Sequence, residues 1–352
     1  MKRSIALAGV LVLAALPALA QNYPERSVTM VVGASPGGST DVSARFLAEP
    51  LSKALGKPVV VENKPGASGN IGAVQVARAK PDGHTLLMQY SGYHVGNPHL
   101  FEKLAWKLED FAPVALVTFS PHVFAVNPNV KANTLKELAD YAKAHPGELK
   151  YGSAGNGSIQ HMATELFAQM SGTKLVHLPY KGAAPAVTDL LGGRLDIVNT
   201  TPPPLVAHIK AGKLKGLAYT ADKRHPQLPD VPTSAESGMP EYKIASWFGV
   251  LAPAKTPQPV IDKLAAEIKK IVESDDFKQK IEEQGGLAAV MDPKEFQALI
   301  AKEFDYWGNV IKTAGITAEE QYRQRRTGNV RSASFGARVR PRAPRSTAGG
   351  VT

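Results

Sequence analysis

The sequence has no cysteine among its 352 residues. That absence excludes disulfide bonds, thiolate metal sites and the attachment of a lipid at a cleavage-site cysteine. Beyond residue 20 the sequence also lacks an apolar run of the roughly 18–20 residues that a membrane-spanning helix needs. It has no H-E-x-x-H motif, and its nine histidines do not cluster with other metal-ligating residues. We therefore expect no resident metal ion and no other cofactor.

The net charge of +10 comes from the two ends of the chain and not from its body. Residues 1–20 hold two basic residues and no acid, whereas residues 320–352 hold eight arginines and one acid. This leaves 31 basic and 30 acidic residues for 21–319. A strongly basic protein would favour nucleic acid or an anionic membrane as its partner. The nearly neutral body gives no such indication, so we expect no nucleic-acid partner.

Residues 1–20 have the three parts of a secretory signal peptide. Lys2 and Arg3 precede an apolar run, and Ala18-Leu19-Ala20 forms an A-x-A cleavage site. The apolar run is too short for a membrane anchor. We expect export to the periplasm, with cleavage after Ala20.

The segment 320–352 differs in composition from the rest of the chain. Its positive charges are all arginines, whereas the body is rich in lysine, and it shows no apolar periodicity. Such a composition is typical of disorder. We interpret the segment as a non-native extension, with a functional basic arm as the alternative.

Short apolar runs alternate with helical patterns through the body. The sequence predicts strands at 27–34, 58–63, 84–90, 113–119, 149–153, 174–180, 195–200, 214–220 and 246–253. It predicts helices near 41–56, 70–80, 134–145, 158–171, 182–192, 203–211, 257–273, 275–284 and 293–314. This alternation is typical of α/β proteins with parallel strands. About 300 mature residues favour two domains.

The stretch GASPGGSTD (33–41) partly matches loops from unrelated enzymes. In a nucleophile elbow the residue after the serine donates its backbone N–H to the oxyanion, but here Pro36 follows Ser35 and has no N–H. In a phosphate-binding loop a lysine precedes the last Ser or Thr, but Ser39 occupies that position. The sequence therefore favours neither a serine hydrolase nor a nucleotide-binding protein.

The same loop retains the features of an anion site. Gly37 and Gly38 let the backbone curl, and Ser39 and Thr40 open a helix whose free N–H groups point into the loop. Such a helix start binds a small anion without a cationic side chain. An ordinary strand-to-helix turn is the alternative. Asp41 is expected to cap the helix and not to contact a ligand.

A second loop, GSAGNGSIQHM (152–162), has the same character. It follows a short predicted strand, is rich in glycine and serine, and opens a helix at Ser158. Two such loops facing each other across a cleft could hold a small acid, because each hydrogen bond to a carboxylate contributes roughly 1.5–3 kcal/mol. His161, in the first turn, is expected to be a structural hydrogen-bonding residue more often than a ligand contact.

Several segments resemble, in order, blocks of the Bug family, the extracytoplasmic substrate-binding proteins of tripartite tricarboxylate transporters. They include YPERSVTMVVGASPGGSTD (23–41), VENKPGASGNIGA (61–73), YGSAGNGSIQHMATELF (151–167) and HLPYKGAAPAVTDLLGGRLDI (177–197). The resemblance runs from about Tyr23 to Glu319. One departure is the strand DIVNT (196–200), where Asn199 and Thr200 replace the Phe-Asp of many family members.

The resemblance implies an α/β periplasmic-binding-protein fold, with two α/β domains, two crossovers and a central ligand cleft. The crossovers are expected near 120–124 and 245–249. Domain 1 would comprise 21–122 and 246–319, and domain 2 would comprise 123–245. The residues expected at the ligand are Ser35, Pro36, Gly37, Gly38, Ser39, Thr40, Tyr90, Ser91, Ser153, Gly155, Asn156, Gly157, Ser158, His161 and Thr200.

The resemblance also implies a binding protein and not an enzyme. We expect a monomer that captures a small organic acid and delivers it to the integral membrane subunits of a tripartite transporter. A periplasmic protein that senses the same acid and acts on a sensor kinase is the alternative. The loop 89–95 is expected to supply the far end of the pocket, with Tyr93 and His94 as weaker candidates than Tyr90 and Ser91.

Export makes a direct prediction about the mature protein. Because Ala18-Leu19-Ala20 precedes Gln21, the mature chain should begin at Gln21. N-terminal sequencing of the periplasmic fraction checks this. Recovery of the periplasmic protein with Met1 retained would contradict it.

Overall fold

The computed structural model describes residues 23–317. The predictions for 1–20 and 320–352 lie outside the described residues. Within them, no helix is both long and apolar enough to cross a membrane.

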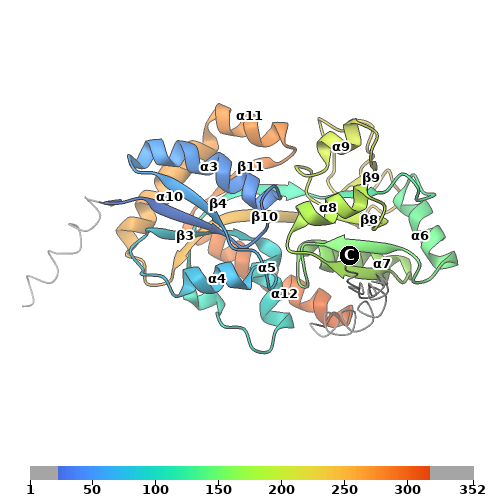
Figure 1. Ribbon diagram of the computed structural model, residues 1–352, viewed down its shortest axis with the longest axis horizontal. Coiled ribbons are helices and arrows are strands. Elements are labelled where there is room, and N and C mark those ends of the chain that lie inside the picture. Colours follow the sequence, from blue (N-terminus) through green and yellow to red (C-terminus); the bar gives the residue numbers. More distant parts are fainter. Residues whose placement is uncertain (1–22, 318–352) are drawn as a thin grey trace, which may run out of the picture. The chain divides into compact units, whose positions relative to one another are not determined.

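The described chain forms two mixed sheets with helices around them (Figure 1). The first sheet has six strands in the order β11-β4-β10-β3-β1-β2. Their bounds are β1 Val28–Val32, β2 Val59–Asn63, β3 Thr85–Tyr90, β4 Phe111–Pro121, β10 Ala245–Pro253 and β11 Leu287–Met291. β1 pairs in parallel with β2 and β3, whereas β10 runs antiparallel to both β3 and β4.

Helices that pack on the first sheet come from both ends of the described chain. They are α3 Ser39–Leu55, α4 Asn70–Ala77, α5 Ser91–Leu100, α10 Gln258–Glu273, α11 Asp275–Glu283 and α12 Pro293–Thr313, with a short 3₁₀ helix at Leu108–Asp110. Helix α3 buries Ala44, Leu47, Leu51 and Leu55, which recur at helical spacing on one face. It contains Pro50 and continues to Leu55.

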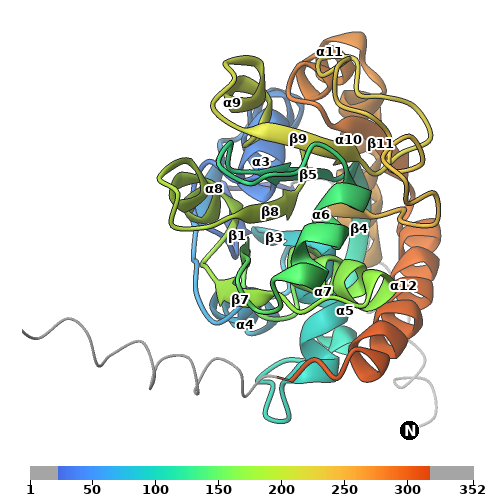
Figure 2. The same cartoon turned by 90° about the vertical axis from the view of Figure 1, so that its right-hand side faces the viewer.

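The second sheet has five strands in the order β7-β6-β8-β5-β9. Their bounds are β5 Val123–Val126, β6 Lys150–Ser153, β7 Val176–Pro179, β8 Ile197–Thr200 and β9 Lys215–Tyr219. The helices are α6 Leu135–Ala144, α7 Ile159–Ser171, α8 Ala183–Leu191 and α9 Val206–Lys210. Figure 2 shows α6 and α7 beside this sheet, with α12 next to α7.

Two hydrophobic clusters form the core. The larger one packs on the first sheet and continues to Phe124 and Tyr151 of the second sheet and to Phe167 on α7. The smaller one lies under α8 and α9 and includes Val187 and Leu190. The alternation of apolar runs therefore predicted the α/β architecture correctly.

Four elements were not predicted, namely α5, β5, β11 and the 3₁₀ helix at Leu108–Asp110. A loop was predicted over 89–95, but Ser91–Leu100 forms helix α5, which contains Gly92, Gly96 and Pro98 although these residues disfavour helix interiors. The glycines are needed for close packing: a Cβ on Gly92 would lie 2.4 Å from the Ile159 nitrogen. The short strands β5 and β11 complete the two sheets only through pairing with distant segments.

The chain leaves the first sheet at His122, between β4 and β5, and returns at Ala245, where β10 begins. The side chain of Thr220 forms hydrogen bonds to both of these passages. The Thr220 hydroxyl accepts a hydrogen bond from the His122 amide at 2.7 Å and donates one to the Ile244 carbonyl at 2.5 Å. The exact domain boundaries at 122/123 and 245/246 stay a prediction.

Replacing Thr220 tests this tie. Thr220→Val keeps the shape of the side chain but leaves the buried His122 amide with a poorer partner. The free energy of unfolding should fall by about 1–3 kcal/mol, seen as a lower melting temperature in calorimetry. Thr188→Val, at an exposed position on α8, is the matched control and should change little. Equal effects in the two variants would contradict a special role for Thr220.

Candidate ligand-binding site

The loop after β1 leads directly into the start of α3. Gly37 has a φ of 81°, which favours glycine, and Gly38 is the N-cap residue without a side-chain cap. The first intrahelical bond runs from the Val42 amide to the Gly38 carbonyl at 3.0 Å. The amides of the first turn therefore have no intrahelical acceptor and are positioned to bind an anion.

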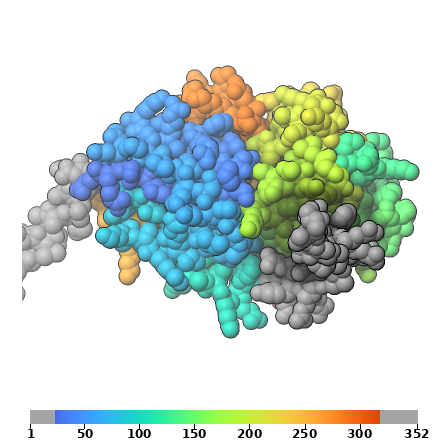
Figure 3. Space-filling model, viewed as in Figure 1, coloured from blue at the N-terminus to red at the C-terminus, as the bar shows by residue number. Residues whose placement is uncertain are grey.

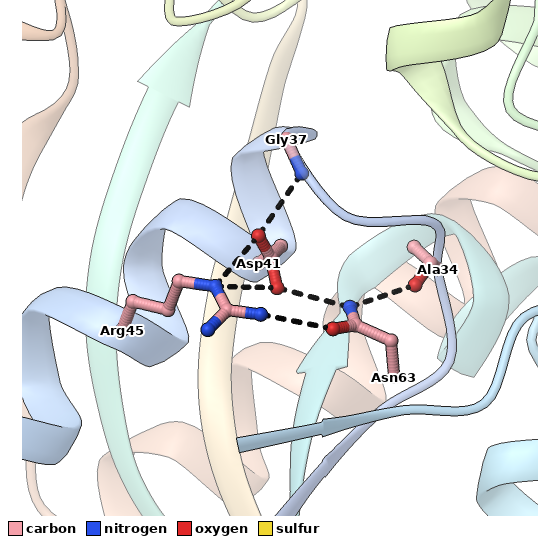
Figure 4. Close-up of polar contacts among 5 residues, drawn as sticks. All are labelled: Ala34, Gly37, Asp41, Arg45 and Asn63. Carbon is pink, nitrogen blue, oxygen red and sulfur yellow. Dashed lines mark hydrogen bonds and ion pairs between the residues drawn. The ribbon is translucent and has the colours of Figure 1, made fainter.

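Asp41 holds this loop in place (Figure 4). Its carboxylate accepts hydrogen bonds from the Gly37 amide at 3.0 Å, from Arg45 Nε at 3.0 and 3.1 Å, and from Asn63 Nδ2 at 2.9 Å. The Asn63 amide group also donates to the Ala34 carbonyl at 3.0 Å. The expectation that Asp41 caps α3 is wrong, because Gly38 is at the cap and Asp41 folds back onto the preceding loop.

Burial of Asp41 acts to raise its carboxyl pKa, but the hydrogen bonds from Arg45, Gly37 and Asn63 outweigh it. The pKa therefore lies below the ordinary value, and the carboxylate is charged at neutral pH. The Arg45 guanidinium is engaged by Asp41 and by the Asn63 side-chain oxygen at 3.1 Å. The positive charge of Arg45 is therefore paired with Asp41, and Arg45 is not among the residues that line the cavity described below.

Two buried histidines hydrogen-bond to the second loop. The Ser153 hydroxyl lies 2.6 Å from His177 Nε2 and accepts a hydrogen bond from the Gly155 amide at 3.1 Å. His161 Nδ1 accepts from the Gly157 amide at 3.3 Å, and its ring stacks on His177 at 3.9 Å. Burial lowers the pKa of His161 to about 3, so its ring is neutral. His161 thus hydrogen-bonds to the backbone of the second loop, and Ser158 is the N-cap residue of α7, where the sequence predicted the helix to begin.

Hydrogen bonds join the second loop and the start of α7 to residues that follow β3 of the first sheet or end it. The Tyr90 hydroxyl donates to Gln160 Oε1 at 2.5 Å and accepts from the Ile159 amide at 2.7 Å. The Tyr93 hydroxyl donates to the Ala154 carbonyl at 2.5 Å. In Figure 3 the blue surface of the N-terminal helices meets the yellow-green surface that contains α8 without a wide opening on this face.

The start of α3 faces the second sheet directly. The Ser39 hydroxyl is hydrogen-bonded to the Thr201 hydroxyl. The Ser35 amide donates to the Lys181 carbonyl at 3.1 Å, and the Ser35 hydroxyl donates to the same oxygen at 3.0 Å. The first loop and the β7–α8 connection are therefore in contact.

A cavity of about 20 Å³ lies where these segments meet. Its lining comes from both sheets and comprises Ala34, Gly38, Ser39, Thr40, Tyr90, Tyr93, Ala154, Gln160, Gly182, Ala183, Thr201 and Phe248. No lining residue is charged. Since one water needs roughly 10–15 Å³ of such space, the cavity has room for about one water molecule. A larger hollow of about 380 Å³, between 119–121, 220–222, 243–245 and α12, contains none of the predicted residues.

The structure brings only some of the predicted residues to this cavity. Gly38, Ser39, Thr40 and Tyr90 line it. The others are not among its lining residues, and these are Ser35, Pro36, Gly37, Ser91, Ser153, Gly155, Asn156, Gly157, Ser158, His161 and Thr200. Ser91 Oγ accepts from the Trp247 amide at 3.3 Å, and Thr200 Oγ1 accepts from Gln160 Nε2 at 3.1 Å.

Sequence reasoning missed several of the lining residues. Gln160 and Thr201 follow predicted residues by two positions or one, and nothing in their own spacing distinguishes them. Gly182 and Ala183 lie in the segment 177–197, which carries part of the family resemblance. That they line the cavity opposite the start of α3 follows only from the tertiary fold. His94, the weaker candidate, stacks on Trp106 at 5.7 Å within the core. No cluster of three or more His, Cys, Asp or Glu that could hold a metal occurs in residues 23–317.

The Asp41 network predicts a pH-dependent contribution to stability. Asp41→Asn removes the charge and should lower the free energy of unfolding by about 1–3 kcal/mol at neutral pH. Because the folded-state pKa is depressed, the difference is complete above the unfolded value of about 3.9 and shrinks as the pH falls through the folded pKa. Melting temperatures from pH 2.5 to 7 measure it. Glu49→Gln, which removes an exposed ion pair with Lys53, is the control with little effect. A pH-independent Asp41→Asn difference would contradict the network.

Comparison with known proteins places this chain in a family. Residues 43–316 match the tripartite tricarboxylate transporter family receptor. The protein BugT from Bordetella pertussis is 37% identical over 320 residues, covering 90% of this chain and 98% of BugT. The structure of the periplasmic binding protein BugD superposes with a TM-score of 0.79 at 36% identity, covering 84% of this chain and 99% of BugD.

The solved structure of an R. palustris protein with adipate resembles this chain about as much as BugD does. It has 36% identity and a TM-score of 0.81, and the match covers 84% of this chain and 99% of that protein. These likenesses confirm the periplasmic-binding-protein fold, and the relatives are binding proteins and not enzymes. The chain belongs to the Bug family of tripartite tricarboxylate transporter receptors.

Proposed function

We propose that this protein captures a small organic carboxylate in the periplasm and delivers it to the membrane subunits of a tripartite transporter. The observation that carries the proposal is the start of α3. Its first-turn amides have no side-chain cap, and Gly38, Ser39 and Thr40 line an uncharged cavity between the two sheets. The relative with adipate supports a carboxylate as ligand.

The arrangement suits an anion for electrostatic reasons. The N-terminus of α3 carries a partial positive charge, and its amides donate hydrogen bonds. The hydroxyls of Ser39, Thr40 and Thr201 can donate further bonds to the same carboxylate. Each charge-assisted hydrogen bond contributes about 1.5–3 kcal/mol, so a few of them hold an acid without a lysine or arginine.

Binding must be coupled to a movement of the two sheets. The cavity of about 20 Å³ is far smaller than a four- to six-carbon acid. The bonds from Tyr90 to Gln160 and from Ser39 to Thr201 join opposite walls and break when the cleft opens. A ligand that contacts both walls would favour the closed state by its differential affinity.

Delivery to a transporter and sensing predict different phenotypes for a deletion strain. If the protein serves transport, a deletion strain should lose uptake of the bound acid, and restoring the gene should restore uptake. Normal uptake with loss of an acid-induced transcriptional response would instead support the action on a sensor kinase.

Gly38→Val tests the carboxylate site. A Cβ at Gly38 would lie 3.7 Å from the Ser35 carbonyl oxygen and 3.9 Å from the Ala183 nitrogen, and the extended backbone there, with φ −83° and ψ 167°, suits a β-branched residue. The variant should fold normally while its side chain fills the cavity. Calorimetric titration with an acid that binds the native protein, beginning with adipate, should show at least a hundredfold loss of affinity.

Ser35→Ala is the matched control in the same loop. The Ser35 hydroxyl donates only to the Lys181 carbonyl at 3.0 Å and does not line the cavity. Its removal should change the affinity by less than about fivefold, since neither chemistry nor ligand contact depends on it. Intact binding in Gly38→Val would mean that GASPGGSTD is an ordinary turn.

A further inference from the structure

The hollow of about 380 Å³ beside α12 is separate from the cavity at the start of α3. Its walls are the end of β4, the segments 220–222 and 243–245, and Glu303, Tyr306 and Trp307 of α12. Figure 2 shows α12 beside β4. We call this space the α12 hollow. It shares no lining residue with the cavity at α3, and its volume is within the range of about 300–1,000 Å³ that is usual for small-molecule sites.

Most of the wall of the α12 hollow is aromatic or aliphatic. Phe119, Tyr306 and Trp307 contribute rings, and Pro121 and Ile244 contribute aliphatic surface. Trp307 and Ile244 are buried, whereas Tyr306 is half exposed. Such a wall favours a ligand with an apolar body, because binding removes apolar surface of both partners from water.

One carboxyl group lies in this apolar wall. Glu303 Oε2 accepts a hydrogen bond from Trp247 Nε1 at 2.8 Å. Within residues 23–317 no basic side chain forms an ion pair with Glu303, and only its chain neighbour Lys302 acts on it through its charge. Burial raises the pKa of the Glu303 carboxyl to about 7, although hydrogen bonds from Trp247 and Trp307 oppose the shift. A buried acid without a cation is costly, so its presence in a hollow needs an explanation.

The other two charged residues that line the α12 hollow pair with each other. Lys243 Nζ lies 2.7 Å from Asp222 Oδ1. Among the described residues that line the hollow, Glu303 is thus the one acid without a basic partner. An anionic ligand would be repelled by the ionised carboxyl, whereas a cationic ligand would supply the missing counter-charge.

We propose that the α12 hollow is a second binding site, which takes an organic cation with an ammonium group on an apolar body. The ammonium group pairs with Glu303, and the aromatic side chains of the wall contact the body. Aromatic rings attract organic cations, and the attraction grows where water is excluded. This site goes beyond the proposed function and does not depend on it.

Calorimetric titration of the full chain with phenethylamine tests the cation site. The amine should bind the native protein, and phenethyl alcohol, which has the same body without the charge, should bind at least tenfold more weakly. Glu303→Gln should lower the affinity for the amine at least tenfold. The matched control is Asp305→Asn, which removes an exposed acid of α12 outside the hollow and should change the affinity less than twofold.

Gly38→Val distinguishes the two sites. It fills the cavity at α3 and should leave the affinity for the amine unchanged, because that cavity and the α12 hollow share no lining residue. No binding of the amine at millimolar concentration, equal binding of the alcohol, or a loss in Gly38→Val or Asp305→Asn as large as in Glu303→Gln would each overturn the proposal.

The pH dependence of binding identifies the carboxyl. Between about pH 6 and pH 8 the ionised fraction of a group with a pKa of about 7 rises about tenfold, while the amine stays protonated. The affinity of the native protein for the amine should rise by the same factor, and that of Glu303→Gln should not. The other ionisable groups of the hollow and beside α12 are the same in both proteins, and these are Asp222, Lys243, Lys302, Tyr306 and His99. A rise of equal size in Glu303→Gln would overturn the proposal.

A last measurement separates binding from a structural role and needs no ligand. Glu303→Gln keeps an oxygen that can accept from Trp247 Nε1 but carries no charge. Because the folded-state pKa is raised, the native protein loses stability as the pH rises through about 7. At about pH 8 the variant should therefore melt at the native temperature or above it. A decrease of several degrees would show that the fold needs the carboxylate and would overturn the proposal.

Discussion

The carboxylate of Asp41 fixes the loop on which the candidate site depends. It fixes the Gly37 amide and Asn63, which in turn holds the Ala34 carbonyl. It also pairs with Arg45, and none of the residues that line the cavity is charged. The first turn of α3 therefore presents only amides and hydroxyls to a ligand. Recognition then depends on the geometry of hydrogen bonds and on the helix dipole, not on a long-range field from charged side chains.

The side-chain hydrogen bonds described between the walls of the cleft are all between neutral groups. Tyr90, Tyr93 and Ser39 each contact a group of the other sheet. In water each such bond contributes only about 0.5–1.5 kcal/mol net, because water can replace the partner when the cleft opens. Thr220, by contrast, joins passages of chain that stay covalently connected in both states. In the proposed function, the hydrogen bonds of Tyr90, Tyr93 and Ser39 exchange with water when the cleft opens, whereas the bonds of Thr220 are kept.

Most of the architecture could be predicted from the sequence because hydrophobic periodicity is local. The loop at 33–41 could also be interpreted from Pro36, Ser39 and the paired glycines. Helix α5 could not, since Gly92 and Gly96 are explained only by the loop that packs on them. The same holds for the site: Tyr90 meets Gln160 across 70 residues, and Ser68 approaches Gly155 across a still longer stretch. Contacts of this range follow from topology, not from spacing.

An uncharged site can still be selective for an anion. Closure removes water from the cleft, so every donor and acceptor on its walls must find a partner or cost about 1–3 kcal/mol. In the proposed site these groups are the uncapped first-turn amides of α3 and the hydroxyls of Ser39 and Thr40. A carboxylate offers them the acceptors that replace water, whereas a ligand without an acceptor at this point would leave them unpaired. The preference for an anion would then come from donors that the fold aims into the cavity and not from a charged side chain.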